Sequence, residues 1–138
     1  AFYHIDTPTK CVRRFDYDPT LAAIAHPTVV ADFTDSPGSP DGMCLDAQGM
    51  LWVALWGGGA VVRIDPATGK EVFRVKVPTT NVTSCAFGGD DLDELYITTA
   101  RSGLSEAKLA AEPSAGSLFR AKVPFRGTPS PRFARAFE

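Results

Sequence analysis

One short segment of the sequence carries residues whose types and order point to chemistry. Asp41 stands between Pro40 and Gly42, directly before an apolar stretch that is typical of a β-strand. Proline fixes its own backbone and restricts the residue before it, so we expect Asp41 on a restricted loop at the entrance to that strand. Hard cations such as Ca²⁺ prefer oxygen ligands, and Gly42 lets a ligand or another backbone come close. The segment therefore makes Asp41 a candidate metal ligand.

The same residues also fit a purely structural interpretation. Pro-Asp-Gly is a common β-turn sequence, because each of these residue types suits a position of such a turn. A single carboxylate is also a poor calcium site, since the ion takes about six to eight oxygen ligands. Both interpretations of Asp41, metal ligand and turn residue, stay open on these residues alone.

Other residues that often do chemistry stand in less favourable surroundings. His4 and His26 have no carboxylate or cysteine at ligand spacing, and we expect His4 to pack on a strand. Ser84 and Cys85 have no visible His or Asp partner that would make either a nucleophile. Cys85 is therefore predicted to be a buried thiol.

Composition and charge exclude several classes of protein. The hydrophobic fraction of 44% and the charged fraction of 22% are typical of a globular protein, and no apolar run approaches the roughly 20 residues that cross a bilayer. The net charge is −2 with both signs scattered, so neither a membrane nor a nucleic acid is an expected partner. Three widely spaced cysteines argue against a disulfide framework, and we expect free thiols in the reducing cytoplasm. These cysteines are Cys11, Cys44 and Cys85.

The elements that must position Asp41 form a repeat of β-strands. Three segments share an aromatic-led apolar strand, a turn and a second strand, and their leading aromatics are Tyr3, Trp52 and Tyr96. The spacing of about 40–50 residues is expected when four antiparallel strands make one propeller blade. The strand pairs are 2–6 with 12–16, 51–55 with 61–65, and 95–99 with 117–121.

The connections between these strands have their own signals. Turn residues at 46–49 and 88–91 precede two of the aromatic strands. The glycines at 57–59 lack the Lys-Ser/Thr of a phosphate loop and are predicted to form a hairpin turn. Residues 105–112 favour a short helical turn, and 124–138 a strand or extended segment. Because the chain begins directly in a strand, we expect a fragment, a processed product or a split subunit.

A longer stretch of sequence resembles a known family. Residues 39–54 closely resemble the PDGMCxDxxGxLWVA signature of the SMP-30/gluconolactonase/regucalcin family. The similarity continues in order through residues 63–70, 75–78, 83–89 and 95–100, and so covers nearly the whole chain. It implies an all-β fold, a β-propeller of the six-bladed SMP-30 type, with residues 1–138 forming its C-terminal half and about three blades.

The resemblance also implies a function and a role for Asp41. The family hydrolyses sugar lactones such as gluconolactone, a carboxylic ester hydrolysis, with one divalent cation that is usually Ca²⁺ and can be replaced by Zn²⁺, Mn²⁺ or Mg²⁺. The aspartate of the family's PDG motif is both a metal ligand and the proposed proton donor and acceptor, and it corresponds to Asp41 here. Asp6 matches the family's YxxD pattern, where it is expected to order the site or a turn.

The departures from the family limit what this chain is expected to do alone. No residue here matches the family's other metal ligands, a Glu and an Asn, or the Arg and Asn residues that hold the sugar. We therefore expect little lactonase activity, and binding of an aldonolactone only if another chain or the missing N-terminal half completes the site and covers the open blade edges. The alternative is a catalytically silent half-propeller that acts as a structural or interaction subunit, with Asp41 kept as a turn residue.

Overall fold

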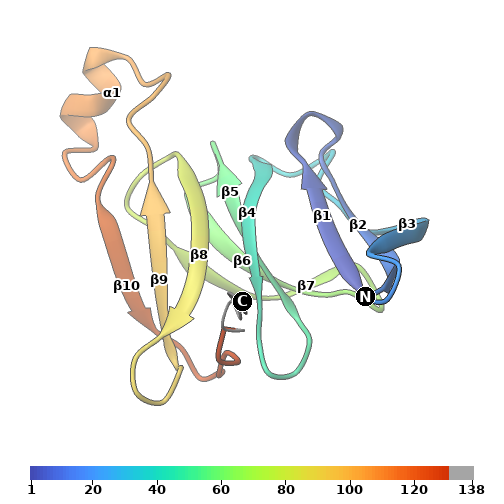
Figure 1. Ribbon diagram of the computed structural model, residues 1–138. Coiled ribbons are helices and arrows are strands. Elements are labelled where there is room, and N and C mark those ends of the chain that lie inside the picture. Colours follow the sequence, from blue (N-terminus) through green and yellow to red (C-terminus); the bar gives the residue numbers. More distant parts are fainter. Residues whose placement is uncertain (131–138) are drawn as a thin grey trace, which may run out of the picture.

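The computed structural model describes residues 1–130, and almost all of its regular structure is antiparallel β-sheet, which confirms the all-β prediction (Figure 1). Three sheets form, with strand orders β1-β2-β3, β4-β5-β6-β7 and β10-β9-β8. The strands are β1 (Phe2–Asp6), β2 (Cys11–Asp18), β3 (Ala23–Asp32), β4 (Ser39–Leu45), β5 (Leu51–Trp56), β6 (Ala60–Asp65), β7 (Lys70–Lys76), β8 (Val82–Gly88), β9 (Glu94–Thr99) and β10 (Leu118–Lys122). The helical segments are η1 (Thr7–Thr9) and α1 (Glu106–Ala111).

The predicted strand repeat is confirmed. Tyr3, Trp52 and Tyr96 lie on β1, β5 and β9, and each of these strands pairs with the next one along the chain. The glycines at 57–59 form the hairpin turn between β5 and β6, as predicted. The repeat therefore corresponds to one hairpin in each of the three sheets.

The two middle strands of the central sheet, β5 and β6, are buried on both faces. Side chains alternate between the two faces along a strand. On β5, Trp52 and Ala54 face the sheet that contains β8, while Leu51, Val53 and Leu55 face the sheet that contains β2. Both β5 and β6 accordingly read as nearly continuous apolar runs. One core cluster contains Trp52, Ala54, Val61, Val77, Val82, Cys85, Leu95, Ile97 and Val123, and the other contains Val12, Ala31, Phe33, Leu51, Val53, Leu55, Val62 and Ile64.

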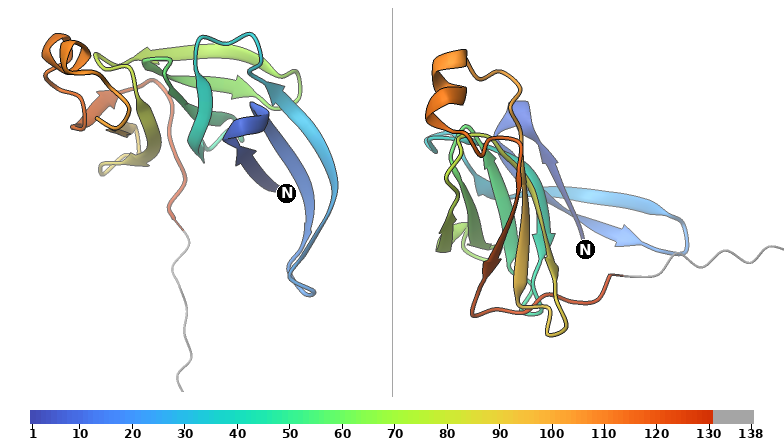
Figure 2. Two further views of the ribbon diagram at one scale, coloured as in Figure 1. Left: turned by 90° about the horizontal axis from the view of Figure 1, so that it is seen from above. Right: turned by 90° about the vertical axis from the view of Figure 1, so that its left-hand side faces the viewer.

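The strands β1, β4 and β8, one from each sheet, lie next to one another. β4 lies between β1 and β8 in the views of both figures, and it contacts both strands (Figures 1 and 2). The central sheet has four strands and each flanking sheet has three. The hairpins β1–β2, β5–β6 and β9–β10 occupy equivalent places in the three sheets. By this correspondence, and within residues 1–130, the first sheet has no strand equivalent to β4 and the last sheet has none equivalent to β7.

The segment between β9 and β10 contains the predicted helical turn. Ser105 caps α1 by accepting a hydrogen bond from the Lys108 backbone N–H. Glu112 then fixes the end of α1, because its carboxylate accepts hydrogen bonds from the backbone N–H and the hydroxyl of Thr80. Among residues 1–130, no helix is long and apolar enough to cross a membrane.

The tail forms no strand over residues 124–130. A single antiparallel bridge between Gly127 and Asp46 attaches it to the central sheet. The remainder of the predicted strand or extended segment, residues 131–138, lies outside the described residues.

Candidate functional site

Asp41 lies within a β-strand and not on a loop before one, which corrects the sequence-based placement. Pro40 pairs with Leu55 and Met43 pairs with Val53, and the register shifts between these two pairs. This bulge accommodates Asp41 and Gly42 as unpaired residues inside β4. Proline is tolerated there because β4 is an edge strand, so its missing N–H breaks no ladder on the open side.

The backbone at Gly42 is pressed against β8. A methyl group on Gly42 would lie 2.3 Å from the Ser84 hydroxyl oxygen and 2.7 Å from the Thr83 carbonyl oxygen. The prediction that Gly42 permits a close approach is therefore confirmed, and the approaching group is the neighbouring strand. Pro40 is fully buried on the other side of Asp41, so β4 holds the carboxylate in a fixed position.

The Asp41 side chain is partly buried, and burial is the cause of the shift in its pKa. Burial raises the pKa of Asp41 above its usual value. Within residues 1–130, no hydrogen bond or ion pair to this carboxylate is present to offset the loss of water. A desolvated carboxylate of this kind gains most from a cation or a proton, and such groups gather at functional sites.

The residues that the structure describes do not by themselves fit a calcium ion. In the described part of the chain, no three His, Cys, Asp or Glu side chains gather closely enough to hold a metal. Because calcium takes about six to eight oxygen ligands, Asp41 supplies at most part of such a site. Any remaining ligands would have to come from outside residues 1–130.

The other residues singled out from the sequence do not join Asp41 in a catalytic group. His4 lies on β1 but its side chain is exposed, so the expectation that it packs is wrong. His26 lies on β3 in the β2–β3 hairpin, with its Nδ1 atom 3.2 Å from Asp16 Oδ2. Asp6 orders the following turn through its backbone carbonyl, which accepts a hydrogen bond from Thr9 Oγ1 at 2.9 Å.

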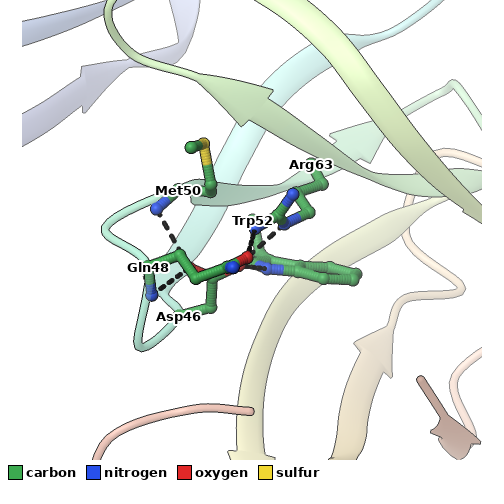
Figure 3. Close-up of polar contacts among 5 residues, drawn as sticks. All are labelled: Asp46, Gln48, Met50, Trp52 and Arg63. Atoms are coloured by element: carbon green, nitrogen blue, oxygen red, sulfur yellow. Dashed lines mark hydrogen bonds and ion pairs between the residues drawn. The ribbon is translucent and has the colours of Figure 1, made fainter. Parts of the chain in front are cut away.

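Sequence reasoning missed a buried polar network at the far end of β4 from Asp41. Asp46 Oδ2 accepts hydrogen bonds from Arg63 Nε at 2.7 Å and from Trp52 Nε1 at 3.0 Å (Figure 3). Asp46 Oδ1 accepts from the backbone N–H groups of Gln48 at 2.9 Å and Met50 at 3.0 Å. Asp46 is 3% exposed and Arg63 is 6% exposed, so the ion pair that joins the β4–β5 turn to β6 is buried.

The electrostatics of this network favour a structural role. Burial alone would raise the pKa of Asp46, but the hydrogen bonds from Trp52, Arg63 and the two backbone N–H groups together lower it. The Arg63 guanidinium also lies 3.9 Å from the centre of the Phe125 ring, where a cation–π contact forms. The sequence signal for this pair was the arginine inside the apolar strand β6, because a buried arginine requires a partner.

Three similarities to known proteins bear on the site. Residues 1–101 match the family described as the SMP-30/Gluconolactonase/LRE-like region. Over 133 residues the chain is 48% identical to a Bacillus subtilis (strain 168) protein named "Putative sugar lactone lactonase YvrE", covering 91% of this chain and 46% of that protein. It is 45% identical over 120 residues to regucalcin of Danio rerio, covering 87% of this chain and 41% of that protein.

A solved structure shows the same arrangement of strands. The crystal structure of a calcium-binding protein, regucalcin, from Agrobacterium tumefaciens str. C58 superimposes with a TM-score of 0.89 at 32% identity. The match covers 96% of this chain and 45% of that one. The chain thus spans less than half the length of these three relatives.

Proposed function

Because the chain belongs to the SMP-30/gluconolactonase/LRE-like family, we propose that it supplies the C-terminal half of a divalent-metal-dependent sugar lactone hydrolase. Asp41 is the residue we assign to the site, as one metal ligand and as a proton acceptor and donor. The observation that carries this assignment is the partly buried Asp41 carboxylate on the fixed bulge of β4. The proposed metal dependence is supported by the Agrobacterium relative, a calcium-binding protein, and the proposed lactone hydrolysis is supported by the Bacillus relative, named "Putative sugar lactone lactonase YvrE".

The chemistry assigned to this chain is limited to what Asp41 can do. Hydrolysis of a lactone requires a water molecule to lose a proton as it attacks the carbonyl carbon, and a carboxylate within hydrogen-bonding reach can accept that proton. The cation, preferably Ca²⁺ with Zn²⁺, Mn²⁺ or Mg²⁺ as substitutes, would supply Lewis-acid chemistry when bound, and residues 1–130 contain no cluster of side chains that could supply its remaining ligands.

We also propose that another polypeptide segment completes the site. It would be either a second chain or a missing N-terminal half of the propeller, and it would pair with the free edges of β1 and β10. An aldonolactone is the substrate class proposed for the completed site. A cytoplasmic location is proposed as well, and the three unpaired thiols support it.

The effect of Asp41→Asn on catalysis tests this proposal. Wild-type chain, combined with the completing segment and Ca²⁺, is expected to hydrolyse gluconolactone, and Asp41→Asn is expected to reduce the rate by about 100-fold or more. The exposed Asp35 provides the matched control, and Asp35→Asn is expected to keep the wild-type rate. Native mass spectrometry of the same samples reports whether the assembly and the cation are present.

The possible results separate the two candidate functions. A stable assembly that binds no cation and hydrolyses no lactone would overturn the enzyme proposal and leave a half-propeller scaffold. Equal loss of activity in the Asp35 and Asp41 variants would show that the effect is not specific to the assigned carboxylate.

A second prediction concerns the stability of the chain without a cation. A carboxyl group whose pKa is raised on folding contributes stability at low pH, and that contribution is lost as the pH rises through the raised pKa. Asparagine cannot ionise, so Asp41→Asn removes the free-energy cost of a charged carboxylate at this partly buried position. At neutral pH the variant is therefore expected to be at least as stable as the wild type, with a gain in the free energy of unfolding of at most about 1 kcal/mol. Urea unfolding near pH 4 and near pH 7 measures the difference, and a marked loss of stability in the variant at neutral pH would contradict it.

A further inference from the structure

Two cysteines from different sheets meet in the core between β4 and β8. The Sγ atoms of Cys44 and Cys85 are 3.7 Å apart, although the residues are 41 positions apart in the sequence. A disulfide bond is about 2.05 Å long, so the sulfur atoms need to approach by less than about 2 Å to form one. The same two strands already touch at Gly42 and Ser84, which keeps the two thiols facing each other.

The two thiols differ in access to solvent. Cys44 lines a hollow of about 290 Å³ beside Phe2 and Tyr3, and a second hollow of about 170 Å³ beside Ala86 and Phe87. Cys85 lies behind it, and only 5% of its surface is exposed. A small oxidant in solvent therefore reaches Cys44 first.

The surroundings of Cys85 disfavour its thiolate form. The hydrogen bond with Cys44 and the burial of the side chain both raise the pKa of Cys85. The Cys85 Sγ atom also lies 3.3 Å from the Trp52 carbonyl oxygen, to which the thiol donates. Such a thiol reacts poorly with an oxidant directly, but it is placed to attack an oxidised sulfur next to it.

We propose that Cys44 and Cys85 are a redox modification site that forms a reversible intramolecular disulfide when the protein meets a peroxide. In the first step Cys44 loses its thiol proton to solvent, the thiolate attacks one oxygen of hydrogen peroxide and the O–O bond breaks. Cys44 becomes a sulfenic acid, and the hydroxide that leaves takes up the proton that Cys44 lost and forms one water. In the second step the Cys85 sulfur displaces hydroxide from the Cys44 sulfur, and the Cys85 proton leaves with that hydroxide as a second water. Two electrons pass from the two thiols to the peroxide.

The resulting bond would link two sheets that no backbone ladder joins. β4 belongs to the central sheet and β8 to the last one, and they are held together by side-chain packing. β4 also carries Asp41. The disulfide would therefore fix the strand that holds the candidate site residue against its neighbour.

Peptide mass spectrometry of the full chain tests the proposal directly. Trypsin separates the three cysteines, because Cys11 falls in peptide 11–13, Cys44 in peptide 15–63 and Cys85 in peptide 77–101. After treatment with hydrogen peroxide, we expect the intact chain to lose about 2 Da and peptides 15–63 and 77–101 to appear as one linked species. A thiol reductant is expected to restore both peptides and the original mass.

Two variants serve as controls. Cys11→Ser leaves the β4–β8 pair intact and is expected to give the same linked species as the wild type. Cys44→Ser removes the thiol that the oxidant reaches first, and it is expected to give no intramolecular link. Addition of oxygen atoms to Cys44 without any link in the wild-type chain would overturn the proposal, as would links that join Cys11 or two separate chains.

Discussion

Replacing Arg63 with methionine is expected to lower the free energy of unfolding by about 3–5 kcal/mol. The substitution keeps most of the side-chain volume but removes the charge that faces Asp46 at 2.7 Å. Asp46, at 3% exposure, would then be a buried carboxylate without an ionic partner, and burial of an unpaired charge is strongly unfavourable. Urea unfolding followed by the fluorescence of Trp52, which hydrogen-bonds to the same carboxylate, measures the loss.

An exposed ion pair provides the matched control for this substitution. Arg74 pairs with Glu71 at 2.6 Å on β7, where both side chains remain about one-third exposed. Arg74→Met is therefore expected to cost about 1 kcal/mol or less. If Arg63→Met and Arg74→Met proved equally mild, the Asp46–Arg63 network would not stabilise the central sheet as the structure indicates. A double variant, Asp46→Leu with Arg63→Met, is expected to recover part of the loss because no charge stays buried.

Gly42→Ala is expected to destabilise the chain by about 1–3 kcal/mol through overpacking. The added methyl group would lie 2.3 Å from Ser84 Oγ and 2.7 Å from the Thr83 carbonyl oxygen. Rotation of the Ser84 side chain moves its hydroxyl, but the Thr83 carbonyl belongs to the backbone, so relief of that contact requires β4 and β8 to move apart. Because Asp41 is the neighbouring residue, the same movement is expected to displace its carboxylate. Urea unfolding measures the stability, and calcium binding to the completed assembly measures the displacement.

A second substitution, at Ser84, distinguishes overpacking from other effects of Gly42→Ala. Ser84→Gly deletes the Oγ and Cβ atoms that the new methyl group meets, but leaves the Thr83 carbonyl, so Gly42→Ala with Ser84→Gly is expected to regain part of the stability. The comparison is Gly49→Ala, where the methyl group meets nothing within 4 Å and the cost comes from the φ of +76°. Ser84→Gly is expected to give no rescue there, and equal rescue of both alanine variants would argue against the contact.

The sequence by itself determined the family and most of the regular structure of this chain. Period-two apolar patterns and turn residues act over a few positions, so the hairpins that carry Tyr3, Trp52 and Tyr96 and the turn at the three glycines were predictable. The helical turn at 106–111 followed from helix-forming residues in the same way. The signature around Asp41 identified the family because it is long and its order is specific.

Only the tertiary structure decided how residues far apart in the chain meet. Asp46 and Arg63 are 17 positions apart, and Cys44 and Cys85 are 41 apart, and no local pattern records either distance. Asp41 was assigned to a loop because Pro-Asp-Gly favours turns locally, whereas pairing with β5 keeps the segment in a strand and confines its irregularity to a bulge. The burial that raises the pKa of Asp41 likewise depends on the packing of whole strands against one another, because desolvation is set by what surrounds a group in space and not by its neighbours in sequence.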